Sequence, residues 1–117
     1  MKTVLIIDDE PMILEFITQV LSSQYNTLTA KNPVELSQQL VSTPKIHCIL
    51  LDLTINCSTT QQLISLIKQY HENTPIIAMS GDTSNSLITD PHKHNLAASL
   101  EKPFTIQELK QIVKNSM

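Results

Sequence analysis

Short runs of apolar residues recur along the chain, and each is followed by polar residues. Residues 2–7, 48–53 and 75–79 form the clearest runs. They are too short for stable helices and are typical of strands buried on both faces of a parallel sheet. Residues 25–30 and 97–100 indicate two weaker strands. We therefore expect five strands.

Between these runs, apolar residues recur at helical spacing in four segments. The predicted inward faces are Ile13, Phe16, Ile17, Val20 and Leu21; Leu36, Leu40 and Val41; Leu63, Ile64, Ile67 and Tyr70; and Ile106, Leu109, Ile112 and Val113. Capping-box patterns precede the second and the last of these helices, and Ser58, Thr59 and Thr60 offer N-caps for the third. Residues 84–95 are weakly patterned, and Pro91 indicates that any helix there is short or broken.

Strands and helices thus alternate five times, which is the signature of an α/β fold with a doubly wound parallel sheet. The chain has 117 residues, of which 41% are hydrophobic. This is enough to bury a core without disulfides or a structural metal. We expect a single domain over residues 1–117.

Charge and composition exclude several classes of function. Eight Lys and Arg against 11 Asp and Glu give a net charge of −3, without a basic run, which argues against direct nucleic-acid binding. No apolar run reaches transmembrane length, and the N-terminus lacks the long apolar region of a signal peptide. The two cysteines lack metal-ligand spacing, so we expect reduced thiols in a cytoplasmic protein without membrane contact.

Polar side chains stand where the predicted strands end: Asp8, Asp9, Asp52, Ser80 and Lys102. In a parallel sheet these ends share one edge, and ligands bind at that edge in open α/β folds. Asp52 alone could merely start a turn or cap a helix. Its predicted neighbours favour a chemical role.

Three clustered carboxylates repel one another unless a cation lies between them, and an all-oxygen ligand set favours Mg²⁺. A lysine and a hydroxyl beside that cation are suited to holding a phosphoryl group. A carboxylate nucleophile can form an acyl phosphate. The pattern therefore indicates phosphoryl chemistry on Asp52.

Four fragments, in order, carry a resemblance to a known family: Ile6-Ile7-Asp8-Asp9-Glu10-Pro11, Leu50-Leu51-Asp52-Leu53, Pro75-Ile76-Ile77-Ala78-Met79-Ser80 and Glu101-Lys102-Pro103-Phe104. Together they resemble a response-regulator receiver domain along essentially the whole chain. The resemblance implies a flavodoxin-like sheet of five parallel strands in the order 2-1-3-4-5, with five helices on both faces.

The resemblance also implies that Asp52 accepts a phosphoryl group from a sensor histidine kinase or a histidine phosphotransfer protein. The implied Mg²⁺ ligands are Asp8, Asp9, Asp52 and the backbone carbonyl of Thr54, while Ser80 and Lys102 would contact the phosphoryl oxygens. The Lys102–Pro103 bond would be cis, an isomer that proline permits. Such a domain is not an enzyme with an external substrate, because it catalyses only its own phosphorylation and slow dephosphorylation. It signals through protein contacts with an output partner, whose identity is unknown.

The chain departs from the family pattern at several positions. Asn56 and Thr60 replace the usual proline and glycine after the phosphoacceptor. Ser99 replaces the aromatic residue that usually rotates during activation, so we expect a weak response of the surface around it. Asn95 replaces a common glycine, although asparagine tolerates the left-handed conformation.

Two rival functions follow from these residues. An aspartate-dependent phosphohydrolase of the haloacid-dehalogenase type would need an aspartate at position 10, where this chain has Glu10, and a cap domain that its length leaves no room for. An atypical receiver that binds partners without phosphorylation would be consistent with Asn56, Thr60 and Ser99.

Three further features have simpler interpretations. Residues 92–94, His-Lys-His, lack further ligands at metal-site spacing and are typical of a solvated loop. Cys57 has no basic neighbour that would make it reactive. His47 opens a strand, which suits a partly buried residue better than a phosphate carrier.

Overall fold

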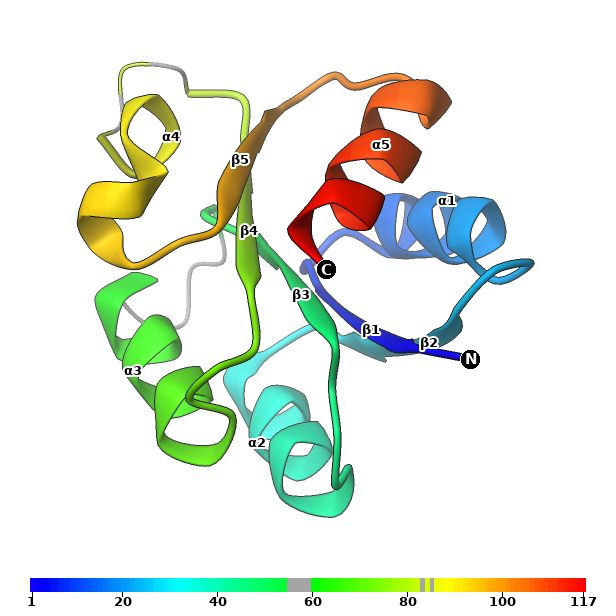
Figure 1. Ribbon diagram of the computed structural model, residues 1–117, viewed down its shortest axis with the longest axis vertical. Helices are drawn as coiled ribbons and strands as arrows, with labels where there is room; N and C mark the ends of the chain where they lie inside the picture. The colour runs from blue at the N-terminus through cyan, green and yellow to red at the C-terminus, as the bar shows by residue number, and fades with distance from the viewer. Residues whose placement is uncertain (55–59, 83, 85) are drawn as a thin grey trace.

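The structure, a computed structural model, describes residues 1–54, 60–82, 84 and 86–117. Its five strands are β1 (Thr3–Ile7), β2 (Asn26–Ala30), β3 (Cys48–Asp52), β4 (Ile76–Ser80) and β5 (Ala98–Glu101). They form one sheet in the order β2-β1-β3-β4-β5, and every neighbouring pair is parallel. The predicted fold class and strand order are confirmed (Figure 1). The predicted strand ends differ from the observed ones by one residue at several places.

The helices are α1 (Pro11–Leu21), α2 (Pro33–Ser42), α3 (Thr60–Tyr70), α4 (Ser86–Thr89) and α5 (Ile106–Ser116), with a 3₁₀ helix η1 (Pro91–His94) after α4. Both expected capping patterns form: Asn32 accepts from the Glu35 backbone N–H, and Thr105 and Glu108 make a reciprocal capping box. The proposed N-caps Ser58 and Thr59 of α3 lie outside the described residues.

The core consists of two clusters of buried side chains, one on each face of the sheet. Helices α2, α3 and α4 contribute to one cluster, and α1 and α5 to the other. Figure 1 shows this division. All residues of β3 and β4 are buried, because helices cover both faces of these central strands.

Four residues predicted to face the core are exposed instead: Phe16 (36%), Val41 (64%), Tyr70 (46%) and Ile106 (49%). A helix lying on a sheet buries a narrow stripe, here pairs four residues apart such as Leu36 and Leu40. Residues at the margin or end of the stripe are exposed to solvent.

Among the described residues, no helix has the length and apolar character needed to cross a membrane.

The weak segment before β5 behaves as the sequence indicates. Helix α4 has only four residues, and Pro91 begins η1. Asn95 ends η1 with a φ of 61°, in the left-handed region. The Ser99 hydroxyl of β5 donates to the carbonyl oxygen of Ile88 at 2.7 Å, which connects α4 to the edge strand.

At the N-terminal edge of the sheet, side chains bind backbone groups of neighbouring segments. The bonds are Thr3 N–H to His47 Nδ1 (3.0 Å), Thr74 Oγ1 to the Ile46 carbonyl (2.8 Å), and His71 Nε2 with the Leu40 carbonyl (3.0 Å). Each bond joins segments far apart in the sequence. Together they fix the loops at the edge opposite the strand-end acids.

Candidate phosphoryl-acceptor site

The register of the sheet places the predicted site residues at one edge. Ile7 pairs with Leu51, so the next residues, Asp8 and Asp52, end their strands at the same level. Asp52 pairs with Met79, and Ser80 pairs with Glu101, immediately before Lys102.

Alternation along the strands explains which of these side chains meet. Residues two positions before Asp8, Asp52 and Lys102 all belong to the core cluster beneath α1 and α5: Ile6, Leu50 and Leu100. The residue two positions before Ser80, Ala78, belongs to the opposite cluster. The side chains of Asp8, Asp52 and Lys102 therefore leave the backbone on one side of the sheet, and the side chain of Ser80 leaves it on the other.

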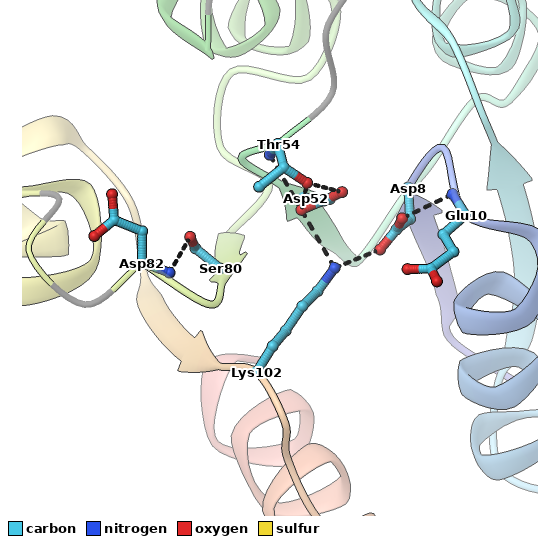
Figure 2. Close-up of polar contacts among 7 residues, drawn as sticks. All are labelled: Asp8, Glu10, Asp52, Thr54, Ser80, Asp82 and Lys102. Carbon is cyan, nitrogen blue, oxygen red and sulfur yellow. Dashed lines mark hydrogen bonds and ion pairs between the residues drawn. The ribbon is translucent and has the colours of Figure 1, made fainter.

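Lys102 bridges the two buried acids. Its Nζ donates to Asp8 Oδ2 at 2.9 Å and lies 3.3 Å from Asp52 Oδ1 (Figure 2). The Asp8 and Asp52 side chains are 0% and 1% exposed, whereas that of Lys102 is 20% exposed. Burial opposes the charge on Lys102, but its hydrogen bond to Asp8 and the Asp52 charge outweigh burial and raise the Lys102 pKa.

The surroundings of Asp8 disfavour its charged form. Burial raises its pKa, and the charge of Asp52 adds to the effect. The hydrogen bonds from Lys102 and from the Glu10 backbone N–H oppose that rise without cancelling it. A further positive charge near Asp8 would therefore relieve the site.

Asp8, Asp9 and Asp52 together fit a metal ion. One oxygen from each carboxylate lies within 4.8 Å of the others, with Asp9 exposed and the other two buried. Carboxylate oxygens are the ligands that Mg²⁺ takes in proteins, usually together with several waters. The exposed position of Asp9 leaves solvent access for those waters, so the donor set fits Mg²⁺.

The loops after β1, β3 and β4 begin in the same way. In each, a side-chain oxygen at the strand end accepts from the backbone N–H two residues later: Asp8 from Glu10 (3.0 Å), Asp52 from Thr54 (3.2 Å), and Ser80 from Asp82 (3.0 Å). Such turns fix the direction of the acidic and hydroxyl side chains at the edge.

Ser80 is 1% exposed, and among the described residues no hydrogen bond joins its hydroxyl to Asp52 or Lys102. Its backbone carbonyl accepts from the Lys102 backbone N–H at 2.9 Å. Figure 2 shows Ser80 directed toward Asp82. The expected edge position is therefore observed, but contact with the acids is not. The Lys102–Pro103 peptide bond is cis, as the family resemblance implies.

Sequence reasoning missed the side chain of Thr54. Its hydroxyl lies 2.9 Å from Asp52 Oδ1 and 2.8 Å from Oδ2, although the resemblance assigned a role only to its backbone carbonyl. A threonine two residues after a strand-end aspartate is a local signal that could have indicated this contact.

An apolar hollow of about 310 Å³ opens beside the site. It is lined by Ile13, Phe16, Lys102, Pro103 and Phe104. The rings of Phe16 and Phe104 lie 6.2 Å apart between centroids. These are the only two phenylalanines of the chain.

The other candidates have no place in the site. Among the described residues, the acidic triad is the only group of potential metal ligands, so residues 92–94 form no metal cluster. Cys48 is buried, which raises its pKa to about 12 and makes it unreactive. His47 accepts a backbone hydrogen bond at the opposite edge of the sheet. Cys57 and Asn56 lie outside the described residues.

Comparison with known proteins identifies a family. The sequence model described as response regulator receiver domain matches residues 4–114. No curated protein matches the chain in sequence.

Solved structures agree on the fold. The chemotaxis response regulator CheY4 of Vibrio cholerae has a TM-score of 0.87 at 20% identity, covering 100% of this chain and 99% of that one. The receiver domain of Francisella response regulator 1452 has a TM-score of 0.84 at 25% identity, covering 99% and 96%. A beryllofluoride-activated NtrC4 receiver domain dimer has a TM-score of 0.86 at 25% identity, covering 99% and 96%.

Proposed function

Because the chain belongs to the response regulator receiver family, we propose that it is a phosphoacceptor in a two-component or phosphorelay system. Asp52 takes a phosphoryl group from a phosphohistidine on a sensor histidine kinase or a histidine phosphotransfer protein. The observation that carries this proposal is the position of Lys102, with its Nζ 2.9 Å from Asp8 and 3.3 Å from Asp52. The beryllofluoride-activated NtrC4 relative supports it, since beryllofluoride mimics an aspartyl phosphate.

The charges of the site explain a requirement for Mg²⁺. Three carboxylates carry −3 and Lys102 carries +1, which leaves −2 at the edge of the sheet. A net negative site repels an incoming phosphoryl group. Bound Mg²⁺, held by Asp8, Asp9, Asp52 and the Thr54 carbonyl, supplies the two charges that neutralise the site and a Lewis acid for the phosphoryl oxygens.

In the proposed transfer, a carboxylate oxygen of Asp52 attacks phosphorus. The bond from phosphorus to the donor's imidazole nitrogen breaks, and that nitrogen keeps the electron pair. The Lys102 ammonium has three protons, so it can bind Asp8 and a phosphoryl oxygen together. Ser80 Oγ accepts from the Asp82 N–H, and its own hydroxyl proton is left to donate to another phosphoryl oxygen.

The chemistry is confined to the protein itself, namely self-phosphorylation followed by slow hydrolysis of the acyl phosphate. We therefore assign it as a signalling module rather than an enzyme with an external substrate. Its output is a change of protein contacts with a partner, without direct nucleic-acid or membrane binding. We place it in the cytoplasm, and the buried, unpaired thiol of Cys48 is consistent with that location.

The apolar hollow beside Lys102 supports a protein as the phosphoryl donor. A donor that reaches Asp52 passes beside Lys102, and this hollow next to Lys102 is lined by Phe104 and by Phe16, which is 36% exposed. Exposed apolar surface of this kind marks a contact site. Phe16→Ala should slow transfer from a phosphohistidine protein and leave the rate with acetyl phosphate unchanged.

The test of the proposed function is incubation with acetyl phosphate and Mg²⁺ followed by intact-mass measurement. Wild type should gain one phosphoryl group, and Asp52→Asn should gain none. Asp90→Asn is the matched control, because Asp90 is an exposed aspartate outside the site, and this variant should behave as wild type. If wild type gains no phosphate, or Asp52→Asn gains as much, the binding-only receiver becomes the better description.

A further inference from the structure

The hydroxyl of Thr54 lies across the carboxylate of the phosphoacceptor. Its Oγ1 is 2.9 Å from Asp52 Oδ1 and 2.8 Å from Oδ2, close to ideal for an O–H donor to a carboxylate. Figure 2 shows Thr54 and Lys102 approaching the carboxylate from different sides. The hydroxyl has one proton, so it serves one oxygen at a time.

The two oxygens of Asp52 have different surroundings. Oδ1 also accepts from the Thr54 backbone N–H at 3.2 Å and lies 3.3 Å from Lys102 Nζ, which in turn binds Asp8. Among the described residues, the one hydrogen bond to Oδ2 comes from Thr54 Oγ1. Oδ1 thus faces the other charged groups, and Oδ2 is left as the attacking oxygen, covered by the Thr54 hydroxyl.

We propose that Thr54 is a positioning residue whose hydroxyl holds Oδ2 of Asp52 and must release it before phosphoryl transfer. This inference rests on the proposed function. With acetyl phosphate, Oδ2 attacks phosphorus, the bond from phosphorus to the acetate oxygen breaks, and acetate leaves with the electron pair. The threonine keeps its proton throughout, because the attacking group is already a carboxylate.

The hydroxyl slows the reaction because it stabilises the charged reactant carboxylate more than the transition state, in which the attacking oxygen is already bonding to phosphorus. A charged carboxylate oxygen is a stronger acceptor than the same oxygen in an acyl phosphate. Removing the hydroxyl should raise the phosphorylation rate about fivefold, which corresponds to about 1 kcal/mol, a typical net value for one hydrogen bond. Thr54 is exposed, so the effect does not arise from core packing.

Thr54→Val removes the hydroxyl and keeps the branched shape, whereas Thr54→Ser keeps the hydroxyl. Both variants retain the backbone carbonyl proposed as a Mg²⁺ ligand. We expect Thr54→Val to be phosphorylated about fivefold faster than wild type by acetyl phosphate at saturating Mg²⁺. Thr54→Ser should match wild type, and the Mg²⁺ concentration for half-maximal rate should be the same in all three proteins.

A second measurement is independent of rates. Beryllofluoride also bonds to an Asp52 oxygen, so Thr54→Val should bind it about fivefold more tightly than wild type. The inference is overturned if Thr54→Val is no faster than wild type, if Thr54→Ser is as fast as Thr54→Val, or if the half-maximal Mg²⁺ concentration moves with the rate. Lack of phosphorylation in wild type, or phosphorylation of Asp52→Asn, would instead contradict the proposed function on which the inference rests.

Discussion

Replacing Lys102 with methionine should destabilise the metal-free protein strongly. The substitution keeps most of the side-chain volume and removes the positive charge 2.9 Å from Asp8 and 3.3 Å from Asp52. At an effective dielectric constant of about 20, unit charges at these separations attract by about 5 to 6 kcal/mol each. The cost of burying the charges offsets most of this attraction, so the net effect is smaller.

Removing one partner of a fully buried ion pair costs about 3 to 5 kcal/mol. Lys102 is 20% exposed, and solvent screens part of its charge, so we expect a loss of about 2 to 3 kcal/mol. For a chain of this length, each kcal/mol shifts Tm by about 4 °C. The melting temperature should therefore fall by about 10 °C in EDTA.

Saturating Mg²⁺ should remove most of this difference, because the cation supplies positive charge to the same carboxylates and binds only the folded state. Urea denaturation of wild type and Lys102→Met, in EDTA and in saturating Mg²⁺, gives the difference in the free energy of unfolding under each condition. Lys110→Met is the control, since Lys110 is exposed on α5 and its loss should change stability by less than about 0.5 kcal/mol. If Lys102→Met costs no more than this control in EDTA, or if Mg²⁺ leaves the gap unchanged, the electrostatic account of the site is wrong.

Three further predictions concern other parts of the molecule. Asp9→Ala should stabilise the metal-free protein by about 0.5 kcal/mol by relieving repulsion, and should reduce the stabilisation by Mg²⁺. An equal Mg²⁺ shift in variant and wild type would remove Asp9 from the metal site. Beryllofluoride should shift the backbone amide signals of residues 52–54 and 80–82 more than those of residues 98–113, because Ser99 lacks the volume to report the change and its hydroxyl is held by Ile88. Comparable shifts in both regions would show that another residue replaces the missing aromatic. Burial, aided by Lys45, Lys2 and the N-terminal amine, lowers the pKa of His47, so the unfolded state takes up this proton first as the pH falls. The part of the stability that depends on neutral His47 should be fully present above about pH 6.5 and should be lost below it. His47→Asn should therefore flatten the decline of Tm between about pH 6.5 and 5.5. If the slope of Tm against pH is the same in variant and wild type, His47 is not the group responsible.

The sequence predicted the architecture well because buried apolar runs and the alternation of strands with helices are enough to define a parallel sheet. Buried runs around Leu50 and Ile77 determined the central strands, and parallel alternation placed their polar ends at one edge. It predicted helix faces less well. Phe16 follows the helical period yet is exposed, since period alone does not say how wide a stripe the sheet covers.

At the site, too, some features were predictable from the sequence and others were not. Alternation could have separated Ser80 from Asp52, because the two stand in neighbouring strands one register position apart. The Thr54 hydroxyl contact depends on the turn after β3, and its strength comes from distances that a sequence does not contain. Positions that belong to strands were therefore predictable. For the loop contact, the spacing of Asp52 and Thr54 is a local signal, but the distances that make it a strong contact were not predictable.

The hydrogen bonds at the N-terminal edge of the sheet have a consequence for engineering. Thr74 and His47 bind backbone groups far from any reacting atom, so these contacts serve stability alone. At the acidic edge, the proposed function requires the carboxylates despite their repulsion, so neutralising Asp9 should raise stability and lower the proposed activity. Selection for a more heat-resistant but still responsive variant should therefore accumulate substitutions around His47 and Thr74 and leave the acids untouched.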